Sequence, residues 1–177
     1  AFLALRRAWV GRAEIAAMLW PEQEAKLAYS NLRKTLFRLQ SLPWANALEV
    51  QGGALRFLAA TDVLDFEAAL REGRTADAVA LKRGELLAGF EDGSEAWSGW
   101  LAFERERLAT GWRGAVLARL DAGIEPAEAV TLSARLLEAD PLDEAALRAH
   151  MAGLARSGQH GQARNAYREF VARLHDD

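Results

Sequence analysis

Apolar residues recur at helical spacing through most of the chain, and one such stretch lies near its start. Ala28, Leu32, Leu36 and Leu39 fall within about 80° of arc on a helix that advances about 100° per residue. They predict a helix over residues 26–40 with one aliphatic face. The opposite face is polar and basic, a pattern typical both of ordinary surface helices and of DNA-recognition helices.

The elements around this helix favour a DNA-recognition helix over an ordinary surface helix. The apolar residues at 2–5 predict the end of one helix, and residues 11–21 carry the i, i+3, i+4 spacing of another, which Pro21 ends. After the basic helix, alternating apolar residues over 48–57 flank Gly52-Gly53, which is a two-residue hairpin signal. The order of helix, helix, basic helix and hairpin is that of a winged helix-turn-helix.

Strand signals end near residue 60, and the rest of the chain is predicted to be helical. Glycines mark most of the breaks, and Pro126 stands just inside one helix start. The predicted helices cover residues 62–72, 74–83, 96–122, 126–139, 143–157 and 160–175.

A repeat is visible within these helices. Ala129 and Ala163 are 34 residues apart, Tyr167 follows Ala163 by one helical turn, and Pro141 follows Ala129 at the spacing of a tetratricopeptide (TPR) unit. Ser133 departs from that pattern, because the TPR motif has an aromatic residue there. The sequence therefore predicts either stacked helical pairs that form a TPR-like array or an antiparallel helical bundle.

These motifs together resemble the SARP-type transcriptional activators of bacteria. The resemblance is carried by the segments Leu19-Trp20-Pro21, Asn31-Leu32-Arg33, 62–66, 84–90, 104–108 and 136–144, together with the hairpin. It implies a mainly α fold, with a winged helix-turn-helix over residues 1–60 whose N-terminal sheet is missing. A TPR-like bacterial transcriptional activation domain (BTAD) would follow over residues 61–177. By the same resemblance, the helical domain would mediate dimerisation and contact RNA polymerase.

The charge distribution supports contact of the first part with nucleic acid. The chain as a whole has a net charge of −3, but residues 1–60 hold eight Lys or Arg against four acidic residues. The remaining residues carry the excess of acidic side chains. A basic region on an acidic remainder is what DNA contact by one domain would produce, although chance clustering gives the same pattern.

The residues expected to contact double-stranded DNA lie on the basic helix and in the wing: Lys26, Ser30, Asn31, Arg33, Lys34, Phe37, Arg38 and Arg56. Arg38 lies on the flank, where phosphate is the expected partner. Asn31 either reads an adenine or forms a capping or core hydrogen bond. Phe37 lies on the outward face, where it either contacts a thymine methyl or packs under the wing. Arg56 is expected to contact the minor groove or the DNA backbone.

Other chemistry finds little support in the sequence. The chain has no cysteine, its three histidines lie on separate segments, and no nucleophile elbow or phosphate-binding loop is present. We therefore expect no enzyme activity, no cofactor and no metal. No apolar run is long enough to span a membrane, and the lack of cysteine fits a reducing cytoplasm.

The aromatic residues Trp97, Trp100, Phe103 and Trp112 crowd one region. They are expected to pack in the core between the two parts of the chain or to form a binding platform. An alternative function for the whole chain is a TPR-type protein-binding scaffold or signalling adaptor that does not bind DNA.

Overall fold

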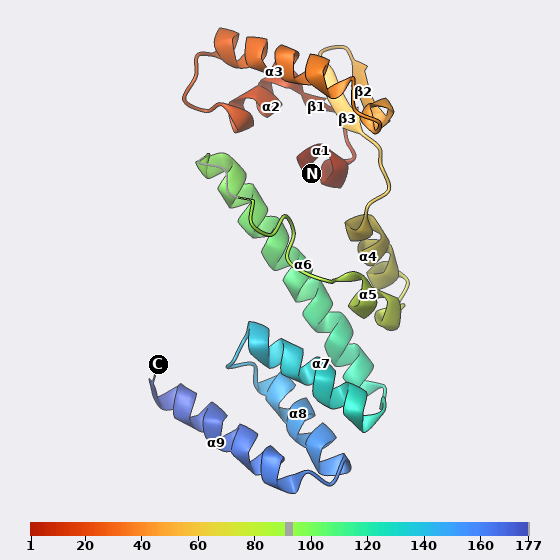
Figure 1. Ribbon diagram of the computed structural model, residues 1–177, viewed down its shortest axis with the longest axis vertical. Coiled ribbons are helices and arrows are strands. Elements are labelled where there is room, and N and C mark those ends of the chain that lie inside the picture. The colour runs from red at the N-terminus through yellow and green to blue at the C-terminus, as the bar shows by residue number, and fades with distance from the viewer. Residues whose placement is uncertain (91–93, 177) are drawn as a thin grey trace. The chain divides into compact units, whose positions relative to one another are not determined.

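The computed structural model describes residues 1–90 and 94–176, the last of these for its backbone only. The chain divides into two compact units. The first unit consists of Ala1–Ala68 and Leu81–Leu108, and the second of Ala69–Ala80 and Ala109–Asp177. The fold is mainly helical, with a small antiparallel sheet near the N-terminus, as the sequence predicts (Figure 1).

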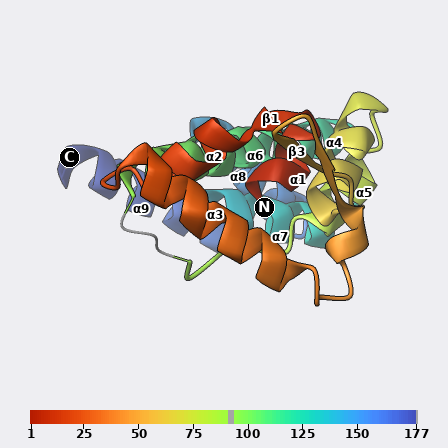
Figure 2. The same cartoon turned by 90° about the horizontal axis from the view of Figure 1, so that it is seen from above.

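The first unit contains the predicted order of three helices and a hairpin. Helix α1 spans Phe2–Arg6, α2 spans Arg12–Leu19 and α3 spans Ala25–Leu39. Helix α3 packs against α2, and the two lie side by side in Figures 1 and 2. A short 3-10 helix over Ala45–Ala47 then leads into the hairpin.

The hairpin consists of β2 (Leu48–Gln51) and β3 (Ala54–Phe57), which pair Leu48 with Phe57 at the open end. Gly52 and Gly53 form its turn with φ of 55° and 81°, values that glycine adopts without steric cost. The hairpin is therefore confirmed. A third strand, β1 (Val10–Gly11), pairs antiparallel with β3 and gives the sheet order β1-β3-β2. The sequence does not predict β1, because two residues are too short to show alternation.

The core of the first unit draws on residues that are distant in the sequence. Its buried members are Phe2, Val10, Ile15, Ala16, Ala28, Leu32, Leu55 and Trp97. Trp97 belongs to helix α6 (Glu95–Asp121), which contributes residues to both units. Its ring centroid lies 4.8 Å from that of Trp100, and the Trp100 ring meets Phe2 edge-on at 5.3 Å. Ser94, just before α6, donates a hydrogen bond of 2.9 Å to the Met18 carbonyl and joins α6 to the end of α2.

The regular elements among the described residues of the second unit are all helices. It contains the last residues of α4 (Asp62–Arg71), most of α5 (Thr75–Leu81) and the C-terminal half of α6. Helices α7 (Pro126–Ala139), α8 (Glu144–Arg156) and α9 (His160–Asp176) complete it. The helices predicted after residue 60 are thus confirmed, with ends within two residues of expectation.

Helices α7 and α8 approach closely at small residues. Ala129 on α7 is buried, as the repeat predicts, and it lies opposite Gly153 on α8. A Cβ atom at Gly153 would stand 3.0 Å from Val130 Cγ2 and 3.3 Å from the Val130 backbone nitrogen. Glycine at this position therefore permits the close contact. Ala163 on α9 is also buried, whereas Tyr167 is exposed.

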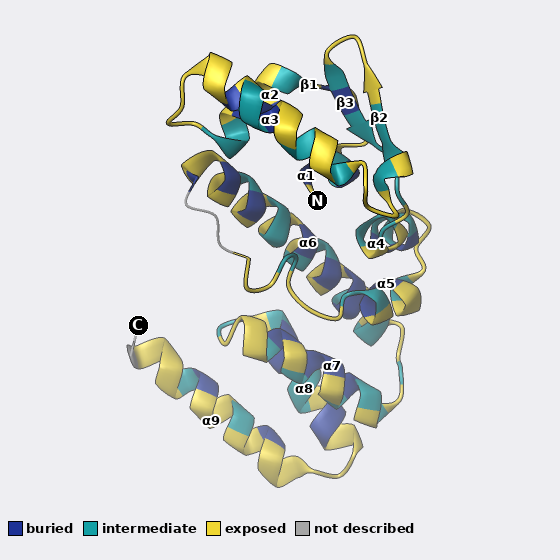
Figure 3. Ribbon diagram, turned by 45° about the horizontal axis from the view of Figure 1, so that its top comes forward, coloured by how far each residue is buried: buried dark blue, intermediate teal, exposed yellow. Residues whose placement is uncertain are grey.

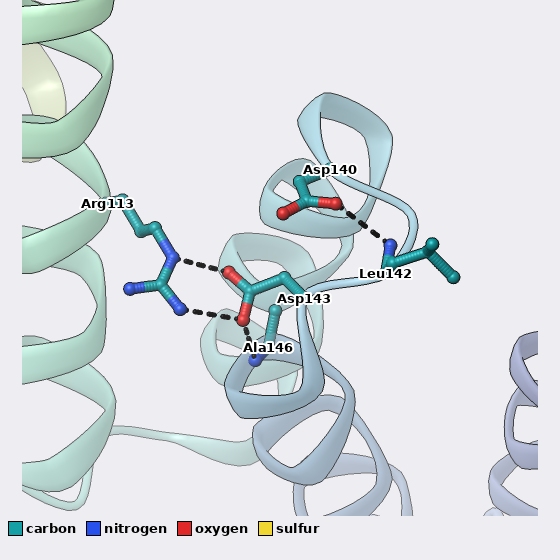
Figure 4. A network of polar contacts seen from close by, with 5 residues as sticks. All are labelled: Arg113, Asp140, Leu142, Asp143 and Ala146. Carbon is teal, nitrogen blue, oxygen red and sulfur yellow. Dashed lines mark hydrogen bonds and ion pairs between the residues drawn. The ribbon is translucent and has the colours of Figure 1, made fainter. Parts of the chain in front are cut away.

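An ion pair joins α6 to the start of α8. Arg113 donates from Nε and Nη2 to the two carboxylate oxygens of Asp143, at 2.6 and 2.8 Å (Figure 4). Asp143 also caps α8, since its Oδ1 accepts the backbone N–H of Ala146 at 3.0 Å. Asp140 Oδ1 accepts the N–H of Leu142 and shapes the turn before it.

The aromatic residues of α6 do not form a single cluster. Trp97 and Trp100 lie in the first unit, whereas Trp112 is buried in the second, where its Nε1 donates to the Val79 carbonyl at 3.4 Å. Phe103 is 66% exposed. It lies about 240° from Trp97 around the helix and so falls outside the buried stripe. Phe103 therefore departs from the expectation that these residues pack in the core.

No helix within the described ranges is both long and apolar enough to cross a membrane.

Candidate nucleic-acid interface

The turn between α2 and α3 sets where the basic helix begins. Helix α2 ends at Leu19, one residue before the Trp20-Pro21 pair, as the proline predicts. In the loop that follows, Gln23 donates its backbone N–H to the Trp20 carbonyl at 3.2 Å. The side chain of Gln23 then accepts a 2.8 Å hydrogen bond from Asn31 Nδ2, which joins the loop to the middle of α3.

This hydrogen bond bears on the two roles considered for Asn31. Asn31 is half-buried, and one of the two N–H groups of its side-chain amide donates to Gln23. An adenine would need the same amide group for bidentate recognition. In this structure Asn31 supports the loop that positions α3.

Helix α3 has the predicted two-faced character. Ala28 and Leu32 are each 3% exposed, and Leu36 and Leu39 are partly buried behind them. The other face is open to solvent, as the exposed residues along α3 in Figure 3 show. Ser30 on this face is half-buried. The face also carries the four basic residues of α3 that are expected to contact DNA, and all four are exposed: Lys26, Arg33, Lys34 and Arg38.

The basic residues of α3 are not neutralised within the protein. Among the residues that the structure describes, no acidic side chain forms an ion pair with any of these four cations. Other arginines of the first unit are paired, for example Arg107, which binds both Glu67 and Glu104 at 2.7 Å. An exposed and uncompensated row of cations on one helix face attracts an anionic ligand.

Phe37 lies in the middle of this basic face and is 75% exposed. The expectation that it packs under the wing is therefore wrong, because a side chain in contact with the hairpin would be covered. By the helical wheel it projects about 180° away from Ala28, on the solvent face of α3.

The wing contributes less positive charge than expected. Arg56 on β3 donates from Nε and Nη2 to Glu49 Oε2 on β2, at 3.1 and 2.5 Å. Its guanidinium also lies over the Trp9 ring, 4.6 Å from the centroid. The side chain is thus held along the sheet, and the tip of the wing at Gly52-Gly53 is uncharged. In this structure Arg56 therefore joins the two strands of the wing through Glu49.

Several residues that support this unit are not evident from sequence pattern alone. Arg105 on α6 donates to the carbonyls of Leu86 and Leu87, at 2.9 and 3.0 Å, and holds the segment after α5. Leu87 packs against the core of the first unit and has a φ of 51°. The sequence shows segments 84–90 and 104–108 only as two separate motifs. The contact between them is tertiary, so sequence pattern does not predict it.

Two of the three histidines contact polar atoms of the protein. His150 Nδ1 lies 3.0 Å from Ser133 Oγ, and His175 Nδ1 lies 2.7 Å from the Val171 carbonyl. Within residues 1–90 and 94–176, no group of three or more His, Asp or Glu side chains is arranged to hold a metal ion.

Comparison with known proteins identifies the family. The family model of the bacterial transcriptional activator domain matches residues 45–177, so the match includes the hairpin and all helices from α4 onward. A search of curated proteins finds no match. Because the matched segment covers well over half of the sequence, the chain belongs to the bacterial transcriptional activator domain (BTAD) family.

Proposed function

We propose that this transcriptional activator binds specific DNA sequences by placing α3 in the major groove. The observation that carries the proposal is the exposed face of α3, where Lys26, Arg33, Lys34 and Arg38 have no acidic partner among the described residues. An α-helix fits the major groove, and the second helix of a helix-turn-helix pair is the one that enters it.

The roles of the individual residues follow from their places on the helix. Arg33 and Lys34 lie on either side of the outward direction and are proposed to reach base edges or the nearest phosphates. Lys26 at the start of α3 and Arg38 on its flank are proposed to bind phosphate. Ser30 would serve as a hydrogen-bond donor close to the bases. Arg56 would hold the wing in place. The wing would in turn contact the DNA backbone.

The helices after residue 60 form the activator region of this proposal. The family resemblance assigns it dimerisation and contact with RNA polymerase. We place the boundary between the two functions at residue 60. Residues before it would contact DNA, and residues after it would contact RNA polymerase. Acidic residues outnumber basic ones after this point, which disfavours DNA contact there.

The test is selection of duplexes from a random DNA pool with the full chain, followed by gel-shift titration of the recovered sequences. Recovery of a common sequence that binds more tightly than the unselected pool supports the proposal. Specific binding typically exceeds non-specific binding by about 10³ or more. Recovery of no enriched sequence would overturn it.

A protein-binding scaffold is the second candidate function, and a groove in the second unit favours it. The groove encloses about 430 Å³ between α7, α8 and α9 and is lined by Leu137, Leu147, His150 and Phe170. Glu138, Glu169 and Arg173 also line it. A chain that selects no DNA but retains a partner through this groove would support the scaffold, and charge reversal at Glu138 and Glu169 should then release that partner.

A further inference from the structure

Phe37 is the most exposed large apolar side chain among the described residues, at 75% of its full accessible surface. A ligand that covered this ring would gain about 25 cal/mol per Å² of apolar surface buried. Its neighbours on α3 indicate what would cover it.

The helical geometry places Phe37 among the cations. Measured around α3 from Ala28, Arg33 lies at about 140°, Phe37 at about 180° and Lys34 at about 240°. Along the axis, Phe37 is about 6 Å from Arg33 and about 4.5 Å from Lys34. A surface that contacts both cations must therefore also cover the ring that projects between them.

The ligand of this face must then combine negative charge with an apolar group at its centre. In the major groove of DNA, the phosphates supply the charge, and the C5-methyl of thymine is the apolar group that the base edges offer. We infer that Phe37 is a specificity-determining residue that recognises thymine through its methyl group. This inference rests on the proposed function, since it requires α3 to enter the groove.

The experiment uses the full chain and the duplexes recovered by selection. Each thymine of the bound site is replaced in turn by uracil, which removes only the C5-methyl and keeps the Watson–Crick pairing. We expect one or two of these replacements to weaken binding by about fourfold each, the effect of losing one buried methyl group. Phe37→Ala should bind the thymine and uracil duplexes equally.

Phe103→Ala is the matched control, because Phe103 is also a largely exposed phenylalanine on a helix of the first unit. It should keep the full preference for thymine. Circular dichroism should show that both variants fold like the parent, since neither side chain is in the core.

The outcomes separate this inference from the proposed function. If the parent chain binds a selected duplex but is indifferent to uracil at every position, the role of Phe37 is overturned and DNA binding stands. The same holds if Phe37→Ala retains the preference for thymine. If no duplex is selected, both proposals are overturned.

Discussion

Arg113 on α6 and Asp143, the residue that caps the start of α8, form a bidentate ion pair (Figure 4). The same carboxylate accepts the N–H of Ala146, so one side chain both caps α8 and fixes it to α6. The side chain of Asp143 is only 2% exposed, whereas that of Arg113 is 46% exposed. The pair therefore satisfies a buried carboxylate with a cation that remains partly in water.

Removal of this carboxylate should destabilise the second unit. Asp143→Ala loses the cap, worth about 0.5–2 kcal/mol, and the ion pair, worth up to about 1 kcal/mol where one partner is exposed. We expect the free energy of unfolding to fall by about 1–3 kcal/mol in urea titrations. Asp143→Asn is the control, because it keeps the cap and loses the charge. Equal losses in the two variants would show that the cap contributes nothing.

Because of the same ion pair, the free energy of unfolding should depend on pH in the acidic range. The hydrogen bonds from Arg113, and then the N–H of Ala146, hold the pKa of Asp143 below its ordinary value of 3.8. The unfolded chain therefore takes up this proton at higher pH than the folded one. The stabilisation is fully present above about pH 5, starts to fall as the pH drops below this, and is lost as the pH falls through the lowered pKa. The difference in unfolding free energy between the parent and Asp143→Asn should shrink over that acidic range. A constant difference from pH 7 to pH 3 would contradict this.

Two glycine-to-alanine substitutions should have opposite signs. At Gly114 in α6 a Cβ meets no atom within 4 Å, so alanine should stabilise the helix by about 0.5–1 kcal/mol. At Gly153 the Cβ would press on Val130, including its backbone nitrogen at 3.3 Å. Overpacking costs about 1–3 kcal/mol, so Gly153→Ala should lower the stability by about 1 kcal/mol after the helix gain. A stabilised Gly153→Ala variant would mean that α7 and α8 can separate at little cost.

The sequence predicts the helices and the hairpin well because each depends on local periodicity and punctuation. Pro21 ends α2, Gly52-Gly53 turns the hairpin, and the spacing of Ala28 and Leu32 identifies the buried face of α3. These signals act over a few residues, so they can be read without knowledge of the tertiary structure.

What the sequence does not predict depends on contacts between distant segments. The ion pair of Arg56 with Glu49 requires the register of β2 on β3, and the hydrogen bond of Asn31 to Gln23 requires the path of a loop. In the same way, the close approach that requires Gly153 depends on how α8 crosses α7. Periodicity shows which side of an element is buried but not which partner will cover it.

The charge on α3 should control DNA affinity through salt. If Arg33 and Lys34 each bind a phosphate, Arg33→Ala combined with Lys34→Ala should weaken binding. It should also reduce the slope of log affinity against log salt by about 1.8, at about 0.9 per contact. The measurement is a gel-shift series over several salt concentrations. Arg164→Ala with Arg168→Ala on α9 is the control pair and should leave the slope unchanged. If both double variants behave alike, α3 does not contact DNA.

Trp97 lies on α6, is 8% exposed and packs in the core of the first unit. Trp97→Ala should cost about 3–5 kcal/mol, because a large buried side chain is removed from a core that relaxes only in part. The loss should be seen both in unfolding and in DNA affinity, since α3 rests on the same core through Ala28 and Leu32.

Two fragments of the chain test whether the core of the first unit depends on α6. Residues 1–108 retain Trp97 and the hydrogen bond of Ser94 to the Met18 carbonyl, whereas residues 1–60 lack both. We expect the longer fragment to unfold cooperatively and to bind the selected duplex more tightly than the shorter one. Phe103→Ala in the longer fragment is the control and should change its stability by less than about 0.5 kcal/mol, as exposed positions do. If residues 1–60 were as stable as residues 1–108, the contribution of α6 to this core would be negligible, and the DNA-binding part would be independent of the activator helices.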